Sequence, residues 1–208
     1  MKIFFDLDGT LIDSRERLYC LFQHLVPASV LTFDEYWNYK RKKTGHEEIL
    51  KSIFSFSQSE VDLFQKKWME QIELPQWLAL DKPFNGVTDY LIAAKKNYDL
   101  YLVTSRQFED LALLQLTDYG WDDIFTNVFV TAQKSEKNDM IKKTIVTGAA
   151  DWFVGDTGKD IQTGKSLGIK TAAVLSGFLN KEKLMEYKPD IIIDTILDFD
   201  PDNKKEYE

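Results

Sequence analysis

The chain has 208 residues and a formal net charge of −8, from 26 basic and 34 acidic side chains. Its content of 44% hydrophobic and 29% charged residues is typical of a soluble globular protein and excludes a collagen-like or disordered chain. The acidic balance argues against nonspecific nucleic-acid binding, which needs a basic surface to displace counterions.

The chain begins with a short strand that leads two carboxylates into a turn. An apolar run starts at Ile3 and continues into Asp6-Leu7-Asp8-Gly9-Thr10-Leu11. A buried parallel strand has such an apolar run, and ligands of open α/β sheets gather at the carboxyl ends of strands. Asp6 and Asp8 would leave the same face of an extended strand, where a cation or a shared proton would relieve their repulsion. An ordinary Asx-Gly turn also fits these letters, so the rest of the chain must decide.

Residues 14 to about 81 have helical periodicity and contain no convincing strand. A helix from Arg15 places leucine and phenylalanine side chains on one face before Pro27. Residues 32–35 and 57–60 have the form of capping boxes, which open two further helices, and another helix lies between these two. We therefore expect a block of consecutive helices directly after the first strand.

After residue 81, strand-like runs alternate with helical ones. The expected strands are 100–103, 128–130, 152–154, 171–174 and 191–193, and the expected helices are 87–96, 106–119, 136–147 and 161–167. This alternation predicts parallel βαβ units with right-handed crossovers, and the first strand needs these strands as partners. The predicted fold class is α/β, with a Rossmann-like parallel sheet core at 1–13 and 82–208 and an inserted all-helical cap domain at 14–81. The charged tail from Asp200 to Glu208 is expected to fray.

Later strand ends carry polar groups that complement the opening pair. Thr104-Ser105 follows an apolar strand and precedes a helix, so a hydroxyl and backbone N–H groups could hold an anion there. Asp156 and Asp160 add two carboxylates after 152–154. Each feature alone has an ordinary explanation as a helix or loop cap. Together they supply oxygen ligands for Mg²⁺, which prefers a few carboxylates, water and substrate phosphate.

Two lysines, Lys134 and Lys137, lie in the loop after the third expected strand and could balance negative charge, although most such lysines are solvated. His24 and His46 are the only histidines and Cys20 is the only cysteine, so we expect no zinc or other soft-ligand site.

The sequence resembles the haloacid dehalogenase-like (HAD) hydrolase superfamily over nearly its whole length. Residues 6–11 fit the first motif residue by residue, and Thr104 matches the second. A lysine at 134 or 137 matches the third motif, and Gly155-Asp156 with Asp160 matches the fourth. The helical insertion resembles the C1-type cap of the phosphoglycolate phosphatase-like branch, as does Pro83-Phe84-Asn85-Gly86-Val87 on return to the core.

The resemblance implies a role for each motif residue. Asp6 would be the nucleophile that forms an aspartyl-phosphate, and Asp8 would carry the proton to the leaving group and lend its main-chain carbonyl to Mg²⁺. The metal would be held by Asp6, Asp8 and Asp156, with Asp160 in a supporting position. Thr104 and the Ser105 amide would hold the transferring oxygens. Lys137, at the start of a helix, is favoured over Lys134, but no proline follows either lysine, which departs from a common form of this motif.

Substrate choice is expected to reside in the inserted helices, because a lid over the strand ends contacts the leaving group. Arg41, Lys43 and His46 lie at a helix break and are the candidate substrate-binding residues. A solvated basic helix end is an equally good explanation for each of them.

The predicted function is Mg²⁺-dependent hydrolysis of a small phosphomonoester such as phosphoglycolate, a sugar phosphate or a nucleotide. A phosphosugar mutase of the same branch and a non-catalytic binding or regulatory relative are the alternatives. The single cysteine suits a reducing compartment, and too few apolar residues precede Asp6 for a signal peptide. We therefore expect a cytoplasmic monomer or weak dimer with a small phosphorylated metabolite as its partner and no nucleic-acid or membrane partner.

Overall fold

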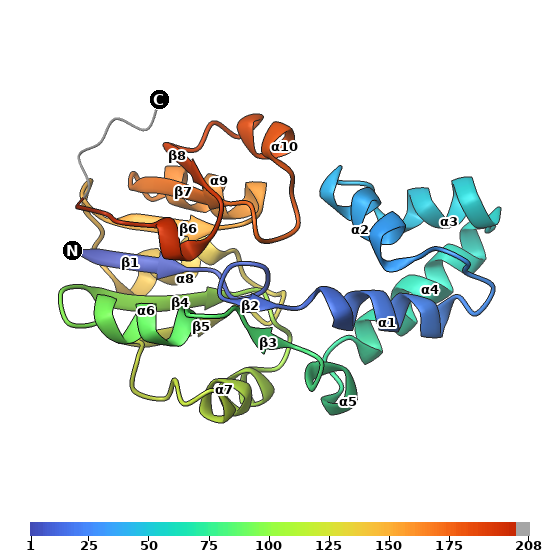
Figure 1. Ribbon diagram of the computed structural model, residues 1–208, viewed down its shortest axis with the longest axis horizontal. Helices are drawn as coiled ribbons and strands as arrows, with labels where there is room; N and C mark the ends of the chain where they lie inside the picture. Colours follow the sequence, from blue (N-terminus) through green and yellow to red (C-terminus); the bar gives the residue numbers. More distant parts are fainter. Residues whose placement is uncertain (203–208) are drawn as a thin grey trace.

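The structure, a computed structural model, describes residues 1–202 and is built around a parallel sheet of six strands in the order β5-β4-β1-β6-β7-β8 (Figure 1). The strands are β1 (Lys2–Phe5), β4 (Asp99–Thr104), β5 (Asn127–Val130), β6 (Trp152–Gly155), β7 (Lys170–Val174) and β8 (Ile191–Ile193). The chain runs outward from β1 on one side through β4 and β5, and on the other through β6, β7 and β8. The strand order therefore reverses at β1, and ligands of open α/β sheets bind at such a switch point.

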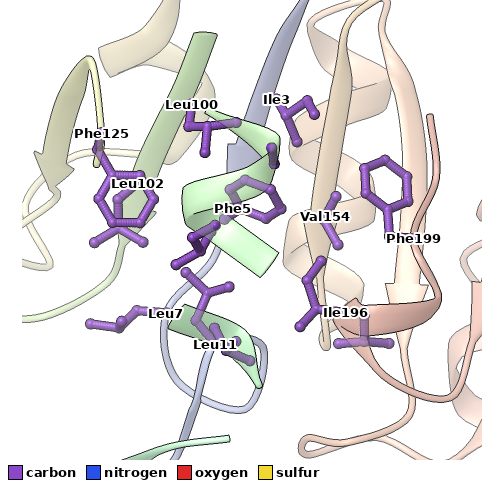
Figure 2. Close-up of a cluster of buried hydrophobic side chains, with 14 of the residues drawn as sticks. Ile3, Phe5, Leu7, Leu11, Leu100, Leu102, Phe125, Val154, Ile196 and Phe199 are labelled. Carbon is purple, nitrogen blue, oxygen red and sulfur yellow. The ribbon is translucent and has the colours of Figure 1, made fainter. Parts of the chain in front are cut away.

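Side chains of β1 alternate between two hydrophobic clusters, one on each face of the sheet. Ile3 and Phe5 belong to the larger cluster, which Figure 2 shows with Leu102 and Val154 of the neighbouring strands. Phe4 points to the opposite cluster. Helices α6 (Val87–Ala94) and α7 (Glu109–Asp118) and the 3₁₀ turn η1 (Ile196–Asp198) supply residues to the first face, whereas α8 (Lys137–Thr144) and α9 (Gly158–Ser166) pack on the second. Because both faces are covered, β1 is apolar from Ile3 to Phe5.

In the sequence, a helical block lies between β1 and the other strands of its sheet. In space, the block stands beside the sheet (Figure 1). It contains α1 (Arg15–Leu25), α2 (Phe33–Arg41), α3 (His46–Phe54), α4 (Gln58–Gln71) and α5 (Pro75–Leu78). An antiparallel ribbon of β2 (Ile12–Asp13) and β3 (Lys82–Pro83) joins the two ends of the block. The block buries an apolar cluster of its own, which includes Leu21, Phe22 and Tyr36.

The predicted α/β fold with an inserted helical block is confirmed, and so are both capping boxes, at Thr32 and Ser57. The ribbon, α5 and α10 (Lys181–Met185) were not predicted, because two-residue strands and single helical turns carry no periodicity. The expected fraying of the tail falls mostly on residues 203–208, which lie outside the described residues. No helix within residues 1–202 is long and apolar enough to cross a membrane.

Truncation of a buried leucine tests the packing of the sheet face. Leu91 of α6 is 0% exposed in the larger cluster, whereas Leu114 of α7 is 57% exposed. We expect Leu91→Ala to lower the free energy of unfolding by about 2–5 kcal/mol, because it removes buried methyl groups and leaves a cavity. Leu114→Ala, the matched change on an exposed helix surface, should alter it by less than about 0.5 kcal/mol. Chemical denaturation measures both, and equal losses would contradict the assigned packing.

Candidate active site

The first carboxylate after β1, Asp6, is buried and held by a buried lysine. Lys137 Nζ donates to Asp6 Oδ1 at 2.5 Å and to Asp160 Oδ1 at 2.7 Å. Burial raises the pKa of Asp6 to about 7, although the Lys137 charge opposes this shift. Burial lowers the pKa of Lys137, but the Asp160 and Asp6 charges outweigh it and raise the pKa above its usual value. The structure therefore brings Lys137, and not Lys134, to the nucleophile candidate.

Asp156 lies in a cradle made by two glycines. Its Oδ2 accepts a hydrogen bond from the Phe178 N–H at 2.6 Å, while its buried Oδ1 has no hydrogen-bond donor in the described part of the chain. A Cβ on Gly9 would lie 2.3 Å from Asp156 Oδ2, and one on Gly177 would lie 2.0 Å from it. Burial, and then the charges of Asp6 and Asp160, raise the pKa of Asp156 well above its ordinary value.

These carboxylates form a group that fits a hard divalent cation. Asp6, Asp156 and Asp160 can each offer one oxygen, and the three oxygens lie within 4.8 Å of one another. Asp160 Oδ2 already has hydrogen-bond donors, because it accepts from the Thr157 N–H at 3.1 Å and from the Thr157 hydroxyl at 2.6 Å. The unpaired Oδ1 of Asp156 and the crowding of like charges are both relieved by a cation with oxygen preference, such as Mg²⁺.

The end of β4 lies beside this group and opens onto a cavity. Thr104 is buried, and its Oγ1 accepts a hydrogen bond from the Arg106 N–H at 3.3 Å, while Ser105 is exposed. A cavity of about 670 Å³ has both Ser105 and Lys137 in its lining. The charged residues of the lining are four lysines and two acids: Lys134, Lys137, Lys143, Lys159, Glu136 and Asp139. An anion is thus attracted to this side of the strand ends in an otherwise acidic chain.

The second carboxylate of the opening motif, Asp8, is paired with two arginines. Arg106 Nε donates to Asp8 Oδ2 at 2.7 Å and Arg106 Nη2 to Oδ1 at 2.9 Å, and Arg17 Nη2 also donates to Oδ1. Burial raises the pKa of Asp8, but the Arg106 and Arg17 charges outweigh it and lower this pKa to about 2. This arrangement differs from the expectation of a proton carrier, because the pairing favours the anion.

Sequence reasoning did not include either arginine or their other acid, Asp81, in the site. Arg106 Nη2 donates to Asp81 Oδ2 at 2.9 Å, and Arg17 Nε lies 2.9 Å from Asp81 Oδ1. The position of Arg106 directly after Thr104-Ser105 was an available signal. Arg17 and Asp81 lie near opposite ends of the helical block in the sequence, so only the folded chain brings them together.

The three predicted substrate-binding residues of the helical block lie in different surroundings. Arg41 Nη2 donates to the Leu175 carbonyl at 3.4 Å, and Lys43 Nζ donates to the Tyr187 hydroxyl at 2.6 Å, so both bridge to the sheet domain. His46 Nε2 lies 2.9 Å from the Tyr36 hydroxyl, and its ring packs against aromatic rings within the block. Burial keeps the pKa of His46 well below its ordinary value. The geometry assigns His46 to the packing of the block.

Comparison with known proteins identifies the family of the chain. A family model described as haloacid dehalogenase-like hydrolase matches residues 3–174. The chain belongs to the haloacid dehalogenase-like hydrolase family.

Curated relatives of this family member match along almost their whole length. Phosphoglycolate phosphatase from Aquifex aeolicus is 28% identical over 92% of this chain and 91% of its own length. Pyrophosphatase PpaX from Bacillus pumilus is 27% identical over 94% of this chain and 93% of its own. Among solved structures, a haloacid dehalogenase-like family protein from Streptococcus pneumoniae superposes with a TM-score of 0.71 at 21% identity and covers 94% of both chains.

A methyl group placed beside Asp156 tests the proposed cation site without touching a ligand. We expect Gly177→Ala to raise the dissociation constant for Mg²⁺ about tenfold or more, because the new Cβ displaces the Asp156 carboxylate. Gly148→Ala is the matched control, since a Cβ there meets nothing within 4 Å in the described residues. Calorimetric titration with Mg²⁺ measures both variants. Equal affinities would place the cation elsewhere.

The raised carboxylate pKa values predict that Mg²⁺ binding depends on pH. A folded-state pKa near 7 for Asp6, against an ordinary value of 3.8, means that protonation stabilises the cation-stripped protein at low pH and that this stability is lost as pH rises through 7. Mg²⁺ must displace this proton, so its affinity should rise by up to about tenfold per pH unit below 7 for each proton released. The increase in melting temperature on addition of Mg²⁺ should be larger at pH 8 than at pH 6. A pH-independent increase would contradict the raised pKa.

Proposed function

We propose that the chain is a Mg²⁺-dependent phosphatase that hydrolyses a small phosphomonoester through an aspartyl-phosphate on Asp6. The observation that carries this proposal is the contact of one buried ammonium, Lys137, with both Asp6 and Asp160 at the end of the central strand. Hydrolases of this family and the two phosphatase relatives described above support the reaction class.

In the proposed mechanism, the residues at the strand ends hold the phosphoryl group while Asp6 attacks phosphorus. The Thr104 hydroxyl and the Ser105 N–H bind its oxygens, and Lys137 fixes the Asp6 carboxylate and stabilises the charge that develops. Asp6 and Asp156 would hold Mg²⁺ together with the main-chain carbonyl of Asp8. The bound cation would neutralise the nucleophile enough for one anion to approach another.

Asp8 is the proposed proton carrier for the leaving group and for the water that hydrolyses the aspartyl-phosphate. Because Arg17 and Arg106 stabilise its anion, Asp8 has to leave these arginines and take up a proton from solvent before it can donate that proton to the leaving group. We propose further that residues 14–81 act as a cap domain over the site. The lysine-rich cavity beside Ser105 favours a small anionic substrate.

A mutase and a non-catalytic relative remain the competing functions. A mutase of this branch would return the phosphoryl group from Asp6 to its substrate and would yield an isomer. A non-catalytic relative would release no phosphate, and among the motif residues no essential group is absent from the chain.

Replacement of the nucleophile tests the proposed reaction. We expect the native chain with Mg²⁺ to release inorganic phosphate stoichiometrically from some members of a phosphomonoester panel. Asp6→Asn should lower the rate by about a thousandfold or more, because a neutral amide cannot form the acyl phosphate. Asp99→Asn, the same change at the opposite end of the sheet, is the matched control and should keep full activity. Equal activity of native and Asp6→Asn proteins would refute the mechanism, and isomer formation without phosphate release would favour the mutase.

A further inference from the structure

Two arginines and two aspartates form a buried ion cluster where the helical block meets the sheet. Its members are Arg17 of α1, Arg106 after β4, Asp8 after β1 and Asp81 before β3. The side chains of both arginines are 4% exposed and that of Asp81 is 0% exposed, whereas that of Asp8 is 20% exposed. Asp8 is therefore the member of the cluster most open to a ligand.

The two guanidinium groups have donors that the cluster does not use. Arg106 Nη1 is buried and has no hydrogen-bond acceptor among residues 1–202. The Arg17 Nε contact with Asp81 Oδ1 falls outside hydrogen-bond geometry, and both atoms are otherwise unpaired in the same described range. Buried donors in native proteins usually have acceptors, so the unpaired donors of the two guanidinium groups mark both arginines as able to hold an anion besides Asp81.

The position of Asp8 fixes how far the arginines lie from the reaction. A leaving-group oxygen that takes a proton from Asp8 must lie about 2.6–3.2 Å from its carboxyl group. Arg106 donates to that carboxyl group at 2.7 and 2.9 Å, and Arg17 donates to it as well. For a leaving-group oxygen that Asp8 could reach from its position in the structure, the guanidinium nitrogens are within about 6 Å. A carboxylate or phosphate two bonds further along the leaving group extends about 3 Å from that oxygen, which brings it within hydrogen-bond reach of the arginines.

Both arginines have further contacts that would hold them in place if an incoming anion displaced Asp8. Arg17 Nη1 donates to the Ile72 carbonyl at 3.3 Å, and Arg106 Nη2 donates to Asp81 and, at 3.2 Å, to Gln115 Oε1. Asp81 would remain as a counter-charge in the cluster. The two guanidinium groups are therefore preorganised for an incoming anion, which lowers the entropic cost of binding it.

The buried acid Glu73 fixes the chain next to Arg106. Its carboxylate accepts hydrogen bonds from the Gln107 N–H at 2.8 and 3.0 Å and from the Phe108 N–H at 3.2 Å. The helical block thereby holds the loop that carries one arginine and itself supplies the other.

We propose that Arg17 and Arg106 form a subsite for a second anionic group, a carboxylate or a phosphate, on the leaving group of the substrate. This group takes the guanidinium donors that Asp8 occupies in the structure. One anion replaces another, so the charge of the cluster does not change. Asp8, released from the arginines, takes up a proton from solvent and delivers it to the leaving-group oxygen. The inference rests on the proposed phosphatase function and narrows its substrate to phosphomonoesters with two anionic ends.

A pair of substrates that differ only in the second charge tests the subsite. Phosphoglycolate and ethyl phosphate share a two-carbon leaving group, and only the first carries a carboxylate. We expect the native chain with Mg²⁺ to have a kcat/KM at least about tenfold higher for phosphoglycolate, the effect of charge-assisted hydrogen bonds. Arg17→Gln should lower the ratio of the two kcat/KM values by about 10- to 100-fold, and Arg17→Lys should retain part of it. The ratio does not depend on the fraction of folded protein, because both substrates are assayed with the same protein preparation.

Arg15→Gln is the matched control, because Arg15 lies in the same helical turn and its guanidinium pairs with Asp13 instead. It should leave the ratio unchanged. A native ratio near one, or an unchanged ratio in Arg17→Gln, would overturn the subsite and show that the cluster only fastens the helical block to the sheet.

A binding measurement separates failure of the subsite from failure of the proposed function. The non-hydrolysable pair 3-phosphonopropionate and propylphosphonate is titrated into native and Arg17→Gln proteins with Mg²⁺. We expect native protein to bind the first at least about tenfold more tightly and the variant to lose this preference. Preference without hydrolysis of either ester would retain the subsite and reject the phosphatase, whereas hydrolysis of both esters without preference in either measurement would do the opposite.

Discussion

The concentration of buried negative charge at the end of β1 is the constraint on which the rest of the site depends. Asp6, Asp8, Asp156 and Asp160 all follow strands that end at the same edge of the sheet. Carboxylates in such a place repel one another and lose hydration, so each needs a cation or a proton. Buried basic residues from distant parts of the chain supply part of this positive charge. Their positions divide the acids into two groups with different chemistry.

The first group is electrostatically incomplete. Three carboxylates, those of Asp6, Asp156 and Asp160, share a single ammonium from Lys137 and are left with two formal negative charges. A divalent cation is a charge that balances this excess, and Gly9 and Gly177 pack so closely on the Asp156 carboxylate that neither position has room for a side chain. Asp6, the proposed nucleophile, therefore belongs to a group whose charge a cation from solution would balance.

The sequence predicted the parts of this arrangement that reside in local patterns. The apolar run before Asp6, the alternation after residue 81 and the two capping boxes each have a short-range physical cause, and the sheet and helices followed from them. The choice of Lys137 rested on its place at the start of the expected helix, as in resembling proteins, and the structure brings this first residue of α8 to the strand ends. The pairing of Arg17 and Arg106 with Asp8 had none, because it joins residues separated by up to 98 positions through tertiary contacts. The burial of His46 was missed for the same reason, because the aromatic rings that enclose it come from three other helices, α1, α2 and α4.

The charges of the second group balance one another. This balance gives the helical block, which supplies Arg17, a way to influence the proposed reaction. Asp8 and Asp81 balance Arg17 and Arg106, so an added anion is accepted only if it replaces one of the carboxylates. Asp81 is fully enclosed, whereas Asp8 is partly exposed, which makes Asp8 the replaceable partner. An anion on the leaving group would thus both anchor the substrate to the arginines and free Asp8, the proposed proton carrier, to take up a proton. A substrate with one anionic end leaves Asp8 with its arginines, so selectivity in this protein would arise from activation of the acid as well as from affinity.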